Sequence, residues 1–311
     1  MTQQQAPMAD STEQKIFLAG RPPLAEFLQF HQAAAQGADA DMGSLAGQWR
    51  SANDHVQELE VLEAGYADSP AICELPPEVR PTCDQIMADP AFRRAYGIVP
   101  TTIGMVELDR LVVYQKYINL DHVARIQATL SGDLSPLKIL RTCLPLEEAP
   151  PPVQISRVAH DTYLFVSASS DLRFLEPTVL RQDQVPQFRR LGQIAGIVGL
   201  VVGFTPNCFS VLQVEGRLIL QNGSHRAYAL RQLGLTHAPA VIQRVSRREE
   251  LPVVAAQPVT KDPNLYLKSL RPPLLKDYFD EQLRTIVTVP RVNRQVKVVF
   301  ASEALDLAEP A

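Results

Sequence analysis

The chain has 311 residues, of which 46% are hydrophobic, 21% charged and 6% aromatic, and its 30 basic and 34 acidic side chains leave a net charge of −4. This composition fits one large or two ordinary folded domains and excludes a disordered polymer. The small acidic excess argues against a surface that is basic throughout, although a local basic patch is compatible with it.

The sequence offers no segment that we expect to enter a membrane. The first residues are polar and lack the apolar stretch of a secretory signal. The uncharged stretch Leu191–Cys208 is broken by four glycines, so its apolar part is shorter than the roughly 20 residues that a bilayer crossing needs. We interpret the glycine-rich stretch 192–203 as backbone packed closely in the core. With four scattered cysteines typical of a reducing compartment, we expect a soluble, cytoplasmic protein.

The N-terminal third is predicted to be a disordered tail over residues 1–14 and a helical extension over 15–100. Apolar residues from Met42 to Leu59 recur at three- and four-residue steps, which predicts a helix from Asp41 to Gly65. A shorter helix is expected over Asp89–Tyr96.

Residues 101–247 alternate between strand and helix patterns, with an insertion at about 145–200. We expect a strand at Val106–Tyr114 and then a helix, capped by Asn119 or Asp121, with Val123, Ile126 and Leu130 on its apolar face. The further elements expected are a strand within His160–Ala168, a helix over Asp183–Leu191, a hairpin over Val211–Leu220, a helix from Ser224 to Leu233 and a strand over Ala238–Val245. Gly234 is in the usual position after a helix C-terminus.

Residues 248–311 read as a C-terminal arm. The segment Leu267–Phe279 is apolar and rich in proline, which predicts an extended piece docked on the body or on another subunit. Its Arg-Pro-Pro-Leu sequence also occurs at residues 21–24, so both segments are candidate arms for a homo-oligomer or a protein partner. Ile286–Val289 and Val296–Phe300 are predicted to form a last hairpin.

One segment carries a chemical signal. Asn222 and Gly223 favour a tight turn between a strand and the helix that begins at Ser224 and His225. Free amides and the helix dipole at such a start favour an anion, and Arg226 adds a guanidinium suited to phosphate. The alternative is structural: Ser224 as a helix cap, His225 as a packed side chain and Arg226 as a surface charge.

The segment NGSHRAYALRQLG…PAVI resembles the ParB/sulfiredoxin-like superfamily, and VELDRLVVYQKYINLDHVARIQATL is similar to the opening strand, loop and first helix of that fold. The resemblance covers roughly residues 105–135 and 210–245 and implies an α+β core. It implies that Asn222, Gly223, Ser224, His225 and Arg226 hold the phosphates of ATP or another nucleotide, with or without Mg²⁺. In this reading Gln115 and Lys116, in the loop after the first strand, contact the same ligand or a small polar substrate, and the alternative for Lys116 is a plain surface lysine. No protein metal site is predicted, because His122 and His160 have no companion at ligand spacing.

Departures from the superfamily narrow the function. In the similar turn of sulfiredoxins, the position of Ser224 is occupied by a nucleophilic cysteine. A serine hydroxyl cannot replace the thiolate in sulfinic-acid reduction, so this reaction is not predicted. Asn222 and Gln115 stand where free-serine kinases carry acids, so phosphoryl transfer would need Glu107, Asp109 or Asp121 as its acid or base. The region after Val245 shows no helix-turn-helix, so sequence-specific DNA binding is not predicted.

Three functions therefore remain open at the level of the sequence. The first is a nucleotide-binding protein, with turnover undecided. The second is a phosphotransferase or nucleotide hydrolase that acts on a small polar substrate. The third is a non-catalytic scaffold that binds a protein partner through the N-terminal helices.

Overall fold

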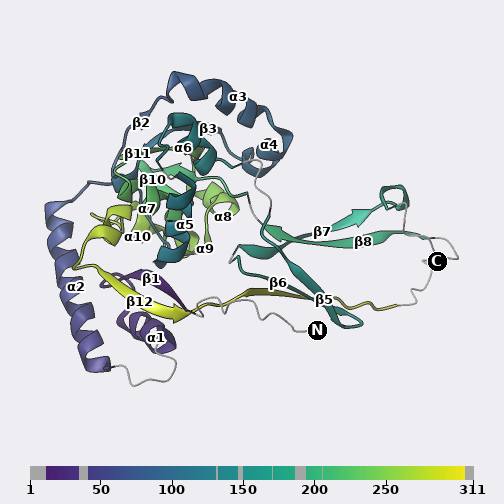
Figure 1. Cartoon of the computed structure of the whole chain (residues 1–311), viewed down its shortest axis with the longest axis horizontal. Helices are drawn as coiled ribbons and strands as arrows, with labels where there is room; N and C mark the ends of the chain where they lie inside the picture. Colours follow the sequence, from purple (N-terminus) through teal and green to yellow (C-terminus); the bar gives the residue numbers. More distant parts are fainter. Residues whose placement is uncertain are drawn as a thin grey trace, which may run out of the picture. The chain divides into compact units, whose positions relative to one another are not determined.

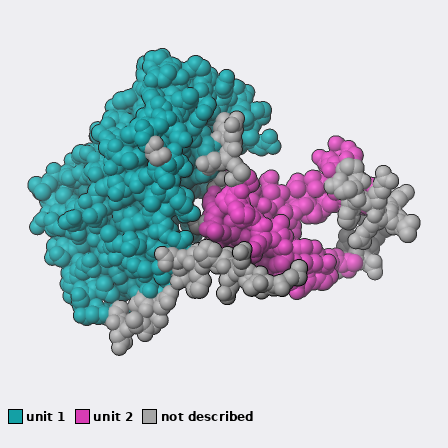
Figure 2. Space-filling model, viewed as in Figure 1, with its two compact units in different colours: residues 1–147, 207–291 teal, residues 148–206, 292–311 magenta. Residues whose placement is uncertain are grey.

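The computed structural model describes residues 12–34, 41–130, 132–145, 150–169, 171–185, 194–204 and 206–304. It is a mixed α+β protein (Figure 1). The chain divides into two compact units, 1–147 with 207–291 and 148–206 with 292–311 (Figure 2). The first unit therefore joins both sides of the predicted insertion. The second combines the insertion with the C-terminal residues.

The first unit holds all the described α-helices and two sheets. Its helices are α1 (Leu24–Ala34), α2 (Met42–Leu62), α3 (Arg80–Ala88), α4 (Pro90–Tyr96), α5 (Leu120–Leu130), α6 (Pro136–Cys143), α7 (Ser224–Gln232), α8 (Leu251–Val254), α9 (Gln257–Lys261) and α10 (Pro263–Leu267). Its strands are β1 (Thr12–Leu18), β2 (Ile72–Cys73), β3 (Thr101–Glu107), β4 (Tyr117–Asn119), β9 (Ser210–Val214), β10 (Arg217–Asn222), β11 (His237–Arg244) and β12 (Arg284–Pro290).

A five-stranded sheet with the order β10-β9-β11-β3-β2 forms the centre of this unit. Its pairs are antiparallel except β9 with β11, which run parallel. The β9–β10 hairpin turns at Glu215 and Gly216, both with positive φ, and this confirms the hairpin predicted over Val211–Leu220. The expected strand at Val106–Tyr114 is displaced: β3 ends at Glu107, and a 3-10 turn follows it.

The second sheet of this unit, β12-β1-β4, corrects two predictions. Residues 12–18 form its central strand instead of a tail and the start of a helix, because Ile16 and Phe17 are buried between strands on both sides. β12 pairs with β1 along its whole length, so residues 286–289 do not form a terminal hairpin with 296–300. Burial of β1 decides both outcomes, since it needs two neighbouring strands to satisfy its backbone.

The helices predicted over Asp41–Gly65 and Asp89–Tyr96 are confirmed. Asp41 accepts hydrogen bonds from the main-chain N–H groups of Gly43 and Ser44 at the start of α2, whose Ala52 and Val56 are buried. Asp89 caps α4 in the same way. α5 and α7 also occur as expected, and Gly234 follows α7 with a φ of +89°.

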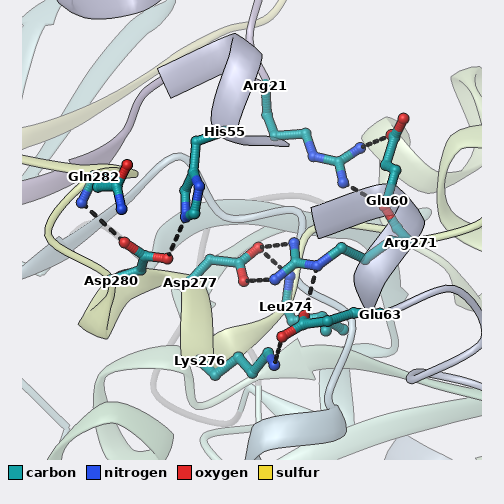
Figure 3. Close-up of polar contacts among 10 residues, drawn as sticks. All are labelled: Arg21, His55, Glu60, Glu63, Arg271, Leu274, Lys276, Asp277, Asp280 and Gln282. Atoms are coloured by element: carbon teal, nitrogen blue, oxygen red, sulfur yellow. Dashed lines mark hydrogen bonds and ion pairs between the residues drawn. The ribbon is translucent and has the colours of Figure 1, made fainter. Parts of the chain in front are cut away.

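The proline-rich segment Leu267–Phe279 packs on the rest of the first unit. Leu274, Leu275 and Tyr278 are fully buried, whereas Leu270 is exposed. Figure 3 shows how charges secure this segment: the Arg271 guanidinium lies between the carboxylates of Asp277 and Glu63. We call Arg21, Glu60, Glu63, Arg271, Lys276 and Asp277 the Arg271 cluster.

The described part of the second unit consists mainly of strands. They are β5 (Gln154–Ala159), β6 (Thr162–Ser167), β7 (Leu172–Leu180), β8 (Ile197–Phe204) and β13 (Arg294–Val299). They form a three-stranded sheet, β13-β6-β5, and the pair β7-β8. Residues Ile197–Phe204 of the uncharged stretch form the strand β8, whose residues are half-buried or exposed, so Gly199 and Gly203 are not the core backbone that the sequence predicts. Of the helix predicted over 183–191, the described part is a 3-10 turn at Gln182–Gln184, and residues 186–193 lie outside the described residues.

No described helix has the length and apolar character that a membrane crossing requires. The four cysteines form no disulfide: Cys83, Cys143 and Cys208 are buried, and Cys73 is exposed.

Candidate functional site

The turn that leads into α7 has a conformation that only glycine adopts freely. Gly223 has a φ of +100°, and a Cβ atom at this position would lie 2.8 Å from Cδ2 of Phe209. β10, the first strand in the order of the five-stranded sheet, leads into this turn, and its Leu220 is fully buried. The absence of a side chain at Gly223 therefore leaves room for Phe209 beside the turn. Asn222 is half-buried and Ser224 is 6% exposed.

Arg226 holds this turn to the rest of the unit. Its guanidinium donates hydrogen bonds to the main-chain oxygens of Thr142, Cys143 and Asn207, and to Oδ1 of Asn207 at 2.9 Å. Only 7% of the residue is exposed. These contacts join the start of α7 to the end of α6 and to the segment before β9. Arg226 is neither the surface charge of the structural alternative nor directed at bulk solvent.

The starts of α5 and α7 lie side by side. The rings of His122 and His225, near the two N-termini, have centroids 4.9 Å apart and are inclined at 74°. Farther along, Nε2 of Gln127 donates to Oε1 of Gln232 at 3.0 Å. The two helices therefore run parallel, and both positive dipole ends face the same place.

His225 is placed in an environment that disfavours its protonation. Its Nε2 atom is buried and has no hydrogen-bond partner among the described residues. Burial, followed by the positive fields of His122, Arg226, Lys15 and Arg125, lowers the pKa of His225 to about 3. Desolvation, with Arg125 and Arg226, also lowers the pKa of His122. Both pKa shifts favour the neutral imidazoles, and the cationic side chains that contribute to them include Arg125 and Arg226.

Gln115 lies beside the strand that leads to the turn. Its Nε2 donates to the main-chain oxygen of Leu220 at 3.1 Å, and its Oε1 is buried without a hydrogen-bond partner among the described residues. The hydroxyl of Tyr278 donates to the main-chain oxygen of Gln115. Lys116, in contrast, is exposed and pairs with Glu26 of α1 at 2.6 Å. The structure therefore brings Gln115 to β10 and directs the Lys116 ammonium to α1.

The acids that phosphoryl transfer would need are all in ion pairs. Asp109 accepts two hydrogen bonds from Arg231, and Asp121 pairs with Arg291. Oε2 of Glu107 lies 3.8 Å from Nη1 of Arg110. Among the described residues, no three of the types His, Cys, Asp and Glu gather in a way that could hold a metal ion.

The sequence did not indicate His122 as part of this site. We had treated it as a histidine without a companion, but its companion is His225 on the other helix. A signal was present, because Asn119 caps α5 through the main-chain N–H of His122, so His122 had to lie in the first turn of that helix. What the sequence lacked was the parallel packing of α5 on α7.

A cavity of about 450 Å³ lies between α3, α4 and the start of β3, lined by Asp84, Met87, Ala88, Phe92, Arg93, Tyr96, Gly97, Val99 and Thr101. None of the residues predicted for the phosphate site lines it. Comparisons of this chain with protein-family models, curated proteins and solved structures give no match.

Proposed function

We propose that this protein binds the phosphates of ATP or a related nucleotide, with or without Mg²⁺, at the shared start of α5 and α7. The observation that supports the proposal most is the His122–His225 pair at two parallel helix N-termini, with Nε2 of His225 buried and unpartnered among the described residues. An anion there would receive main-chain amides and imidazole donors, and its negative charge would restore the protonation that the site disfavours when empty.

The proposal gives each predicted residue a distinct part. Gly223 lets the main chain approach the phosphates, while Asn222, Ser224 and His225 contact them. Arg226 is a positioning residue, because its guanidinium is directed at protein carbonyls that fix the turn. Gln115 lies on the side where a small polar substrate would enter. Lys116 contributes only if it leaves Glu26.

The proposal is one of binding, not of turnover. A general base must be within hydrogen-bond reach of the proton that it takes from the substrate. Glu107, Asp109 and Asp121 are each paired with an arginine, so the contacts of these three acids do not favour the phosphotransferase or hydrolase alternative. The scaffold alternative is the outcome to test against.

Thermal shift and calorimetry with ATP, CTP, GTP, ADP and tripolyphosphate, each with and without Mg²⁺, test the proposal. We expect at least one of them to stabilise the protein. His225→Gln and His122→Gln should each weaken that ligand by about 10-fold or more, as expected for loss of a charge-assisted hydrogen bond. His160→Gln, the same change in the second unit, should leave the affinity unchanged. Failure of every nucleotide to stabilise the wild type would favour the scaffold.

A further inference from the structure

The β7–β8 pair has two edges of different character. β7 carries the features that natural sheets use to discourage a further strand: Arg173 and Glu176 are exposed charges, and Pro177 has no N–H to offer. β8 reads IVGLVVGF, with no charge and no proline. Among the described residues each of the two strands pairs only with the other, so the outer edge of β8 presents backbone donors and acceptors to no described strand (Figure 1).

One face of this pair is aliphatic. Val179 lies opposite Val198, and Pro177 lies opposite Leu200. Val179 is 77% exposed and Val198 is 69% exposed, so this cross-strand pair is open to solvent. Phe174, opposite Val202, is also exposed. A continuous apolar patch of this kind is rarer on a monomer than scattered single residues and marks an interaction surface.

The character of β8 selects the partner. A strand without charges is complementary to itself, because a second copy brings no like charges to the edge and leaves no charge unpaired. Antiparallel pairing of two identical strands needs a two-fold axis perpendicular to the sheet, and two-fold symmetry is the commonest in oligomers. That axis keeps the aliphatic faces of both copies on the same side, so they form one larger apolar surface. Leu200, near the middle of the eight-residue strand, lies closest to the axis.

We propose that β8 is the interface of a symmetric homodimer, in which β8 of a second copy pairs antiparallel with it to make a four-stranded sheet β7-β8-β8-β7. Backbone hydrogen bonds between the two β8 strands join the copies, and the aliphatic side chains of the two strands pack beside one another across the new strand pair. This interface uses residues of the second unit alone and does not depend on the nucleotide site.

The test uses the full chain in sedimentation velocity over a wide concentration range. The wild type is expected to dimerise. Leu200→Lys and Leu200→Glu, each alone, place like charges near the axis and should weaken the dimer at least 10-fold. An equal mixture of the two variants should recover dimers, because opposite charges then meet. Leu62→Lys on α2, where the leucine is 78% exposed, is the matched control and should dimerise like the wild type.

A covalent test keeps the proposal falsifiable if the lysine variant fails to fold. Leu200→Cys in a Cys73→Ser background, where the three remaining native cysteines are buried, should form a disulfide dimer on mild oxidation. A wild type that stays monomeric at every concentration overturns the proposal, whether or not it binds some other protein. So does a dimer that Leu200→Lys leaves unchanged, since its interface must then lie elsewhere.

Discussion

The guanidinium of Arg21 donates a hydrogen bond to the main-chain oxygen of Arg271, 250 residues later in the chain. The two Arg-Pro-Pro-Leu segments are therefore not separate arms for a partner, because they meet inside the first unit (Figure 3). Arg21 also pairs with Glu60 near the end of α2, and Arg271 pairs with Glu63 in the residue after that helix. The C-terminal end of α2 is therefore held by ion pairs to both Arg-Pro-Pro-Leu segments.

Removing the Arg271 guanidinium should destabilise the protein strongly. Arg271 and Asp277 are 1% and 2% exposed, so Arg271→Met leaves the buried Asp277 carboxylate without the guanidinium that pairs with it. The expected loss in the free energy of unfolding is about 3–5 kcal/mol. Urea denaturation followed by circular dichroism measures it. Arg80→Met, which breaks the exposed pair with Glu74, should cost only ~0–1 kcal/mol. Equal losses in the two variants would contradict a structural role for the cluster.

Arg226→Lys should cost stability even though it keeps the charge. A lysine ammonium cannot reproduce the fork that reaches Asn207 and Cys143 together, so buried carbonyls lose their donors. We expect a loss of about 1–3 kcal/mol in the free energy of unfolding. Arg125→Lys, at an exposed position on α5, is the control. If Arg226→Lys unfolds like the wild type and yet loses nucleotide affinity, the residue is a direct ligand and the positioning role is wrong.

Comparison of Gly223→Ala with Gly234→Ala separates the stability cost of backbone strain from the cost of a steric clash. Both Gly223 and Gly234 have positive φ, so alanine at either position carries the left-handed penalty of about 1–2 kcal/mol. At Gly223 the new Cβ also meets Phe209, whereas nothing lies within 4 Å at Gly234. Overpacking at the first site should add about 1–3 kcal/mol. Chemical denaturation of the two variants gives the comparison, and equal losses would show that Phe209 moves aside.

The sequence predicted those elements whose determinants are local. A capping residue, a helical apolar stripe and a terminal glycine lie within a few residues of one another, so α2, α5 and α7 could be predicted. The β9–β10 hairpin likewise follows from Glu215 and Gly216. Propensity cannot choose a strand's distant neighbour, and β12 and β13 show this, since they pair with β1 and β6 instead of with each other.

The candidate site shows the same division. Gly223 and the start of α7 are local features, and both could be predicted. The partners of Arg226 come from α6 and from the segment before β9, 83 and 19 residues away, and no spacing in the sequence indicates them. The approach of His122 to His225 is also a result of helix packing.

His55 and His225 should make the free energy of unfolding change with pH in opposite directions. Burial lowers the pKa of His55, but hydrogen bonds to Asp280 and Glu58 outweigh it, so its pKa in the folded protein lies above 6.5. Its contribution to stability is full below pH 6.5 and is lost as the pH rises through the folded pKa. The pKa of His225 falls to about 3 on folding. Its neutral form is favourable above pH 6.5, and stability is lost below that value because the unfolded state takes up the proton first.

The free energy of unfolding, measured from pH 5 to 8.5 in anion-poor buffer, checks both signs. The wild type should lose about 1.4 kcal/mol per pH unit below 6.5 from His225, which is about 2 kcal/mol at pH 5, and His225→Gln should lack this loss. His55→Gln should instead flatten the decline on the alkaline side, by less than ~1 kcal/mol because Glu58 is exposed. A nucleotide or tripolyphosphate that binds His225 should reduce the acid loss, since a protonated imidazole is then favoured. If His225→Gln shows the same loss in the free energy of unfolding below pH 6.5 as the wild type, His225 is already protonated or hydrogen-bonded in the folded protein.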